Sequence, residues 1–297
     1  MMHYIGPAYR PPFEEKSLLL QVSTGCNHNK CAFCSMYKGV KFTPSPMEDI
    51  ESDVRFIGRN RTLFKRAFLV GGDPFALPYK RLKRIGKLIG EHIPRIESIG
   101  CYASIPNVLA KTPEQLNELA QLGYANLNIG LETGLDDVLA TMRKGYTADE
   151  AREALSRLNE AGIPFTLNLV HGLAGSGRSL ENALASAELV NEARPALVIV
   201  TALHVDEATE LSEWVDSGQF KLPSLQEVIE EEAAFLRATE LSDTIFFGMH
   251  ETLPVRVNGH LPKDRDFLAS EVEAALQRFP GQQLAAPMRR RKPITRA

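Results

Sequence analysis

Three cysteines close together in the sequence are the residues best suited to chemistry. Cys26, Cys31 and Cys34 share a segment that also contains glycine, asparagine and lysine. A structural zinc site takes four protein ligands, and an electron-carrying [4Fe–4S] cluster takes four cysteines. Three cysteines therefore leave one metal position open to an outside molecule. The alternative is that His28, inside the same segment, completes a closed zinc site.

The cysteines belong to a chain in which apolar β-rich runs alternate with helical patterns. This alternation is typical of repeated βα units with a parallel sheet. The expected strands are Leu18–Val22, Ala67–Val70, Ser98–Tyr102, Ala125–Leu131, Phe165–Val170 and Leu197–Leu203. The expected helices between them are Met47–Arg59, Tyr79–His92, Pro113–Leu122, Leu135–Met142, Ala148–Ala161 and Leu180–Ala193. Such units can close into a barrel, remain a partial barrel or open into a doubly wound sheet.

In all three arrangements the functional residues lie at the carboxyl ends of the strands. The cysteines follow the first expected strand, Gly71-Gly72-Asp73-Pro74 follows the second and Ser104 follows the third. The other three strands end in Glu132-Thr133-Gly134, His171-Gly172-Leu173 and His204. Polar, glycine-rich and metal-binding groups are therefore predicted to gather at one edge of the sheet.

Taken together, these motifs resemble the radical S-adenosylmethionine (SAM) superfamily. In that family three loop cysteines after the first strand hold a [4Fe–4S] cluster, and SAM chelates the fourth iron. The usual spacing is Cys-x3-Cys-x2-Cys, and this chain has one additional residue in the first gap. Phe33, before the last cysteine, matches the aromatic residue that the family places beside the adenine. The resemblance thus implies that Cys26, Cys31 and Cys34 are the cluster ligands.

The turn Gly71-Gly72-Asp73-Pro74 looks like the family's GGEP-type turn, with Asp73 in place of the commoner glutamate. In the family the backbone of this turn approaches the amino group of SAM. Glycine permits such a close approach because it has no side chain. The resemblance therefore implies that Gly71, Gly72 and Asp73 bind the cofactor.

Residues 128–134 and 142–147 resemble the "GLESG … MRKGYT" block of one branch of the superfamily. This branch contains the oxygen-independent coproporphyrinogen oxidases and the methylthiotransferases. The resemblance implies that Glu132 and Lys144 contact SAM, with Arg143 as the alternative cation. These roles agree with the chemistry of SAM, whose carboxylate needs a cation and whose ammonium and ribose hydroxyls need acceptors.

Three more polar residues are candidates for cofactor binding. Asn168, in the fifth strand, stands where relatives carry a polar residue near the ribose, although a structural hydrogen bond would also explain a buried asparagine. Ser104 is a candidate for a ribose or methionine contact, and His204 for the cofactor or the substrate. The remaining candidates for the substrate face are His171, His250, Glu251, Arg256 and His260. Cys101 is expected to be a core thiol.

The resemblance implies an α/β fold with a partial (β/α)6 TIM-like barrel over residues 1–214. A C-terminal helical extension, 215–297, is expected to cover the barrel mouth. Within it, 288–297 carries the basic run Arg289-Arg290-Arg291-Lys292 and is expected to be a flexible tail. The implied activity is reductive cleavage of SAM to a 5′-deoxyadenosyl radical that abstracts hydrogen from a small-molecule substrate. A flavodoxin- or ferredoxin-type reductase would supply the electron.

Charge and hydropathy set limits on the partners. The 34 lysines and arginines and 37 acidic residues give a net charge of −3, so no overall positive field favours nucleic acid. No run approaches the roughly 18 apolar residues of a membrane span. We therefore expect a cytoplasmic enzyme that does not bind a membrane or nucleic acid.

Two alternatives remain open from the sequence. One is a SAM- or haem-binding relative that has lost catalysis. The other is a zinc-binding α/β protein that uses Cys26, His28, Cys31 and Cys34.

Overall fold

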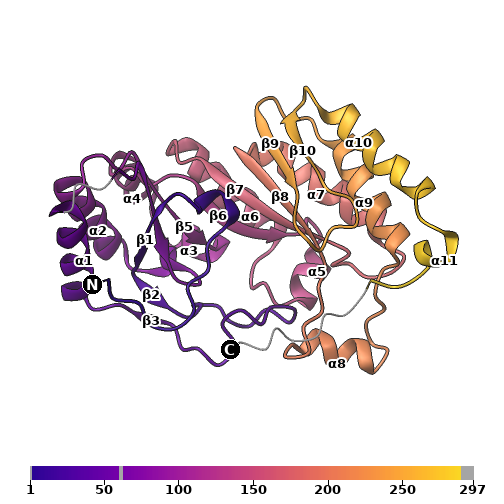
Figure 1. The fold of residues 1–297 in the computed structure, drawn as a ribbon, viewed down its shortest axis with the longest axis horizontal. Helices are drawn as coiled ribbons and strands as arrows, with labels where there is room; N and C mark the ends of the chain where they lie inside the picture. Colours follow the sequence, from indigo (N-terminus) through magenta and orange to yellow (C-terminus); the bar gives the residue numbers. More distant parts are fainter. Residues whose placement is uncertain (1, 60–62, 289–297) are drawn as a thin grey trace. The chain divides into compact units, whose positions relative to one another are not determined.

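The computed structural model describes residues 2–59 and 63–288 (Figure 1). Its main sheet has the strand order β1-β4-β5-β6-β7-β8-β9-β10. The pairs β1–β4, β4–β5, β5–β6, β7–β8 and β8–β9 are parallel, and β9–β10 is antiparallel. The predicted α/β class with a mostly parallel sheet is therefore confirmed. By its internal contacts the chain divides into two compact units.

The first unit comprises Met1–Asn29, Tyr37–Ile129 and Glu153–Phe165. Its strands are β1 (Leu18–Gln21), β2 (Ser23–Thr24), β3 (Thr43–Pro44), β4 (Arg66–Val70), β5 (Ser98–Ala103) and the start of β6 (Leu127–Glu132). Its helices are α1 (Met47–Arg59), α2 (Tyr79–His92), α3 (Ile105–Leu109), α4 (Pro113–Gln121) and most of α6 (Ala148–Glu160), with short 3-10 turns at Pro12–Glu14 and Pro74–Ala76.

Local sequence signals explain where these helices begin. Thr112 and Gln115 form a reciprocal capping box at the start of α4, and Pro113 occupies its first position. Thr147 accepts from the amide of Glu150 and caps α6 in the same way. The strands β4 and β5 bury Phe68 and Leu69 completely, so the parallel sheet forms the core of this unit.

The second unit comprises Lys30–Met36, Gly130–Arg152 and Thr166–Ala297. Its strands are β7 (Phe165–His171), β8 (Leu197–Ala202), β9 (Thr244–Gly248), β10 (Val257–Leu261) and the end of β6. Its helices are α5 (Asp136–Thr141), α7 (Ser179–Ala193), α8 (Glu210–Asp216), α9 (Leu225–Ala238), α10 (Arg265–Ala274) and α11 (Gly281–Leu284), with a 3-10 turn at Ala275–Gln277.

The extension after Trp214 contains strands as well as the expected helices. β9 continues the parallel sheet beside β8, with Ile245 opposite Leu197, and β10 returns antiparallel as the edge. β10 alternates half-buried and exposed residues, which is the weak pattern of an edge strand and was not predicted from the sequence. The expected tail at 288–297 lies, apart from Met288, outside the described residues.

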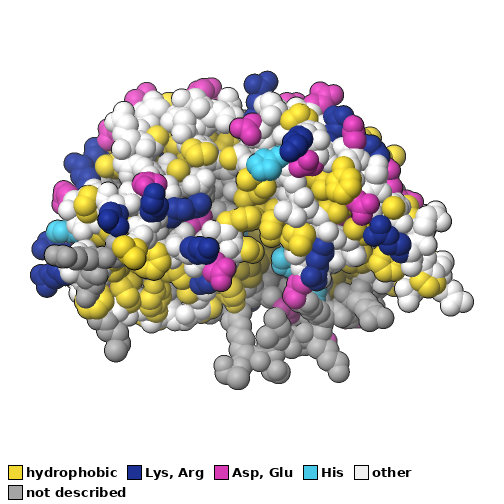
Figure 2. Space-filling model, turned by 45° about the horizontal axis from the view of Figure 1, so that its top comes forward, with side chains coloured by type: hydrophobic (Ala, Val, Ile, Leu, Met, Phe, Trp, Pro, Cys, Tyr) yellow, Lys and Arg dark blue, Asp and Glu magenta, His cyan; other side chains and the backbone are white. Residues whose placement is uncertain are grey.

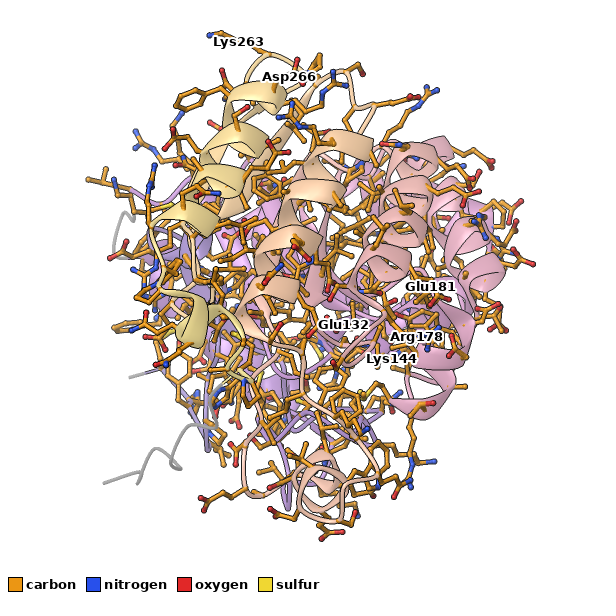
Figure 3. All side chains as sticks on the ribbon, turned by 90° about the vertical axis from the view of Figure 1, so that its right-hand side faces the viewer. Glu132, Lys144, Arg178, Glu181, Lys263 and Asp266 are labelled. Atoms are coloured by element: carbon orange, nitrogen blue, oxygen red, sulfur yellow. The ribbon has the colours of Figure 1, made fainter. Side chains whose placement is uncertain are left out.

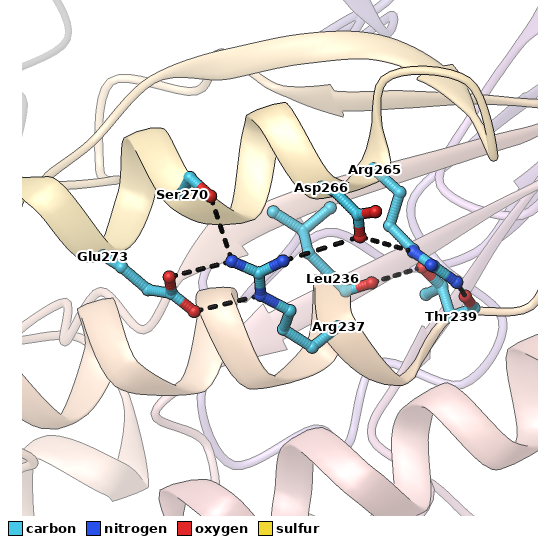
Figure 4. A network of polar contacts seen from close by, with 7 residues as sticks. All are labelled: Leu236, Arg237, Thr239, Arg265, Asp266, Ser270 and Glu273. Atoms are coloured by element: carbon cyan, nitrogen blue, oxygen red, sulfur yellow. Dashed lines mark hydrogen bonds and ion pairs between the residues drawn. The ribbon is translucent and has the colours of Figure 1, made fainter.

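Helix α9 lies between α7 and α10 in Figure 1 and packs against both. Arg237 of α9 donates to both carboxylate oxygens of Glu273 and to Ser270 of α10 (Figure 4). Arg237 and Glu273 are 41% and 47% exposed, and such surface pairs contribute about 0–1 kcal/mol. The buried apolar side chains Leu236 and Leu268 therefore hold α10 in place more than these charges do.

Charged side chains of both signs are interspersed on the face shown in Figure 2, in agreement with the small net charge. Among the residues that the structure describes, no helix is both long and apolar enough to span a membrane.

Candidate functional site

A largely buried ion pair joins Glu132 and Lys144, the two residues predicted to contact SAM. The Nζ atom of Lys144 lies 2.9 Å from Oε1 of Glu132, and their side chains are only 11% and 12% exposed. Figure 3 shows the two residues next to each other. Burial acts to lower the pKa of Lys144, but the combined effect of Glu132, Tyr146 and Cys31 outweighs it and raises the pKa above its ordinary value. Lys144 therefore remains charged inside the protein.

Aromatic rings border the Lys144 ammonium. The rings of Phe33 and Tyr146 have their centroids 6.0 and 5.8 Å from Nζ. Tyr146 is itself fixed, because its hydroxyl donates to the carbonyls of Gly130 and Leu131 at 3.0 and 2.9 Å. Phe33 of the cysteine loop and the Glu132–Lys144 pair, which lie far apart in the sequence, are thus brought together within the second unit.

The end of α5 and the start of α8 hold the part of the cysteine loop that belongs to the second unit. The amide of Ala32 donates to the carbonyl of Met142 at 3.1 Å, and its carbonyl accepts from the amide of Leu211 at 3.0 Å. Ser35 donates to Asp206 at 2.6 Å. The negative charge of a Cys31 thiolate also contributes to raising the pKa of Lys144. The loop and the basic residue are therefore electrostatically coupled.

The alternative cation, Arg143, is engaged elsewhere. Its guanidinium lies 2.8 Å from the carboxylate of Glu210, and both side chains are well exposed, at 53% and 37%. Of the two neighbouring basic residues, Lys144 is the one that lies beside Glu132.

In the first unit, the turn after β4 packs directly against Cys26. The amide of Gly72 donates to the carbonyl of Gly25 at 2.8 Å. A Cβ atom at position 72 would lie 2.8 Å from both Cα and Cβ of Cys26, which no side chain tolerates. The approach of this turn to the first cysteine therefore requires glycine.

Asp73, the next residue, is buried with one of its oxygens unsatisfied. Its Oδ2 accepts from Ser104 at 2.7 Å and from Asn107 at 2.6 Å. Its Oδ1 is also buried but has no hydrogen-bond partner among the described residues. Burial raises the pKa of Asp73 to about 6, against the opposing effects of Ser104, Asn107 and Lys111. An unsatisfied buried acceptor suits a ligand that brings a hydrogen-bond donor.

Asn107 and Lys111 support this carboxylate and were not predicted from the sequence. Lys111 is 4% exposed, and its Nζ donates to the carbonyls of Phe75 and Asn107 at 2.7 and 3.0 Å. Burial lowers its pKa to about 8. Asn107 lies in α3, Ser104 caps the start of this helix and Lys111 follows its end, and this spacing of three and four residues is a signal that could have indicated them.

The remaining predicted residues fall into different environments. Asn168 is half-buried in β7, and His204 is half-buried just after β8. His250 contacts Thr252 at 2.8 Å, and Thr252 accepts from the amide of Ala202 at the carboxyl end of β8. Glu251 and Arg256, in the same loop between β9 and β10, are exposed.

The other two candidate histidines and Cys101 do not join these residues. His171 is 2% exposed and faces Glu231 and Phe235 of α9 instead of the substrate face. His260 is exposed on β10 opposite Ile245, near the start of β9 and thus far from the carboxyl ends of the strands. Cys101 is fully buried, and burial raises the pKa of its thiol.

In the part of the chain that the structure describes, the four cysteines are not joined by disulfide bonds. Cys26, Cys31 and Cys34 are all half-buried. Over residues 2–59 and 63–288 no three His, Cys, Asp or Glu side chains are already grouped as a metal site, and this includes the set with His28. The surroundings of the cysteines nevertheless suit the predicted ligands: Gly72 lets the turn after β4 pack against Cys26, and Lys144 offers positive charge near Cys31.

Known proteins with similar sequences are larger than this chain. The tRNA uridine(34) acetyltransferase of Methanocaldococcus infernus is 20% identical over 255 residues, covering 69% of this chain and 46% of the relative. The heme chaperone HemW of Bacillus subtilis is 24% identical over 168 residues, covering 56% of this chain and 44% of the relative. The chain spans less than half the length of the curated relatives it matches.

Among solved structures, the coproporphyrinogen III oxidase HemN of Escherichia coli, described as a radical SAM enzyme, has a similar fold. It superimposes with a TM-score of 0.52 at 18% identity, covering 74% of this chain and 52% of that chain. The model of the radical SAM superfamily matches residues 20–190, more than half of the sequence. The resemblance inferred from the cysteines and the glycine turn is therefore confirmed, and the chain belongs to the radical SAM superfamily.

Proposed function

We propose that the protein is an enzyme that binds a [4Fe–4S] cluster through Cys26, Cys31 and Cys34 and binds SAM at the neighbouring strand ends. A bound and reduced cluster would supply the electron for cleavage of the C5′–S bond of SAM to methionine and a 5′-deoxyadenosyl radical, which would remove a hydrogen atom from the substrate. The single observation that carries this proposal is the buried Glu132–Lys144 pair bordered by Phe33.

In this proposal Lys144 binds the carboxylate of SAM, and Glu132 accepts from its ribose hydroxyls. The ion pair holds both side chains in one geometry before SAM binds, so little conformational entropy of these side chains is lost on binding. Phe33 offers its ring to the adenine. The low exposure of the pair strengthens these charged hydrogen bonds, because little water competes for them.

In the first unit, we assign the ammonium group of SAM to Asp73 and to the backbone of Gly71 and Gly72. Oδ1 of Asp73 is buried without a partner, so a bound ammonium would satisfy it. Ser104 and Asn107 hold the other oxygen and thereby orient the carboxylate. Asn168 and His204 are assigned to the ribose side and the substrate side.

The substrate is proposed to be a small molecule that enters at the carboxyl ends of β7, β8 and β9. His250 is suited to contact it, because Thr252 ties this loop to the end of β8. Residues 215–297 are proposed to help exclude water, which a reactive carbon radical requires. The electron is proposed to come from a flavodoxin- or ferredoxin-type reductase.

A second candidate is a haem- or SAM-binding protein without turnover. The similarity to the heme chaperone of Bacillus subtilis supports this second candidate. Both candidates predict an iron–sulfur cluster, and only the first predicts cleavage of SAM.

The ligand assignment is tested by anaerobic reconstitution with iron and sulfide. We expect a brown protein with absorbance near ~400 nm and about four irons per chain. Cys31→Ala should lose most of this iron, whereas Cys101→Ala, a matched change of a buried core thiol, should retain it. A colourless protein that binds one zinc, or full iron loading of Cys31→Ala, would refute the assignment.

A further inference from the structure

A chain of buried polar side chains lies directly behind Glu132. Thr133 donates its hydroxyl to Oδ1 of Asn182 at 2.5 Å, and Nδ2 of Asn182 donates to Oε1 of Glu231 at 2.6 Å. Glu231 also accepts from the amide of Gly172 at 3.0 Å. Thr133, Asn182 and Glu231 are 0%, 1% and 0% exposed. The loop after β6, helix α7 and helix α9 are thus joined inside the second unit.

Thr133 of this chain and the nearby Ser186 of α7 accept hydrogen bonds from backbone amides of the loop that carries Glu132. The hydroxyl of Thr133 accepts from the amide of Leu135 at 3.0 Å, and the hydroxyl of Ser186 accepts from the amide of Gly134 at 3.1 Å. Gly134 lies so close to α7 that a Cβ atom there would be 2.2 Å from the carbonyl oxygen of Ala185. The two residues after Glu132 are therefore fixed to α7 through both hydrogen bonds and packing.

Glu132 itself has an unfavourable backbone conformation. Its φ angle is +68°, in the left-handed region that residues with a side chain rarely adopt. Such conformations persist only where the surroundings enforce them. The carboxylate of Glu132 reaches Lys144 from this conformation, so the enforcement matters for the ion pair.

We propose that Thr133, Asn182 and Glu231 are positioning residues for the SAM-binding pair Glu132–Lys144. They act through the backbone of the loop and do not touch the cofactor. The inference rests on the proposed function, because it assigns the pair to SAM. It also gives α9 a role at the cofactor side, although Glu231 lies beyond residues 20–190 that match the family.

The geometry explains why each member is needed. Asn182 uses its oxygen toward Thr133 and its amide nitrogen toward Glu231, so one side chain links the loop to α9. Glu231 is further contacted by Nδ1 of His171 at 3.2 Å. Removal of one member takes away one hydrogen bond of its buried neighbour, and the loop would relax to avoid the cost of the unsatisfied atom.

The test compares three variants of buried threonines. Thr133→Val removes the hydroxyl while it keeps the shape, and Thr133→Ser keeps the hydroxyl. Thr244→Val is the matched control. Thr244 is 3% exposed and donates to the carbonyl of Pro195 at 2.7 Å. It is the first residue of β9, at the end of this strand away from the carboxyl ends where SAM is proposed to bind. SAM binding to the reconstituted protein is measured by isothermal titration calorimetry, and thermal unfolding is measured on the same samples.

We expect Thr133→Val to raise the Kd for SAM by roughly tenfold or more, because a displaced ligand side chain loses its productive geometry. Thr133→Ser and Thr244→Val should stay within about twofold, even where Thr244→Val lowers the Tm as much as Thr133→Val does. A merely structural role would lower the Tm and leave the Kd unchanged.

Glu231→Gln provides the second variant should Thr133→Val not fold. It removes one acceptor oxygen from the chain without changing its size, and it should also raise the Kd for SAM. In the double variant the two effects should be less than additive, because both residues act through Asn182. If every variant that folds binds SAM with the Kd of the wild type, the inference is overturned. Absence of SAM binding in the wild type instead overturns the proposed function.

Discussion

The amide of Gly72 donates to the carbonyl of Gly25 at 2.8 Å, and this bond brings the turn after β4 against Cys26. The contact connects two motifs that lie more than forty residues apart in the sequence. It also leaves no space for a side chain at position 72.

Gly72→Ala should therefore impair cluster loading. Its Cβ would lie 2.8 Å from Cys26 atoms, so either the turn or the first cysteine must move. We expect iron content after anaerobic reconstitution to fall to less than about half of the wild-type value, because an iron–sulfur site needs each thiolate in place. Gly90→Ala is the control, because no atom lies within 4 Å of a Cβ there. Equal loading of the two variants would show that the contact is not required.

Lys144→Met should weaken both SAM binding and the fold. It leaves the carboxylate of Glu132 buried without its cation, and breaking a buried pair typically costs about 3–5 kcal/mol. Urea unfolding of the unreconstituted protein measures this cost, and calorimetry with SAM measures the loss of affinity.

Arg143→Met is the matched control for that change. Its pair with Glu210 is exposed, so we expect a loss of at most about 1 kcal/mol and unchanged affinity for SAM. A larger effect at Arg143 than at Lys144 would reverse the assignment of the cofactor's cation.

The buried carboxyl group of Glu232 leads us to expect a specific pH dependence of stability. It is fully buried on α9, neither carboxylate oxygen has a partner among the described residues, and burial raises its pKa to about 8 from an ordinary value of 4.5. A raised folded-state pKa contributes stability that is complete below the unfolded-state pKa and is lost as the pH rises through the folded-state pKa. The free energy of unfolding should therefore fall between about pH 4.5 and pH 8 because of this group.

Glu232→Gln should remove that part of the slope. At pH 8–9 the variant should be more stable than the wild type by more than about 1 kcal/mol in urea unfolding. The exposed neighbour provides the comparison, since Glu230→Gln should keep the wild-type slope. If the free energy of unfolding of Glu232→Gln changes with pH in parallel with that of the wild type, Glu232 is not a buried, protonated carboxyl.

Much of the fold was predictable because its signals are local. Helices α1 and α2 have the predicted bounds, and α4 begins at the predicted residue Pro113. Helix α3 was missed, because it is short and contains Pro106 near its start. The edge strand β10 was missed because its sequence, Val-Asn-Gly-His-Leu, shows no clear alternation of apolar and polar residues.

The candidate site was predictable only where a motif names its residues. Glu132 and Lys144 follow from the spacing of one block, and the structure pairs them. Asn107 and Lys111 belong to no motif: Asn107 acts through a hydrogen bond to Asp73 and Lys111 through its charge, and only their spacing from Ser104 could have indicated them. Glu231 lies on a helix that is acidic overall, so its burial became visible only in the packed structure.

Formation of 5′-deoxyadenosine tests the central claim most directly. The anaerobically reconstituted protein is incubated with dithionite and SAM, and the nucleoside is quantified by chromatography and mass spectrometry. The account predicts that it forms with the wild type, is abolished by Cys31→Ala and persists in Cys101→Ala. A cluster-loaded wild type that binds SAM and releases no 5′-deoxyadenosine under these conditions would contradict it.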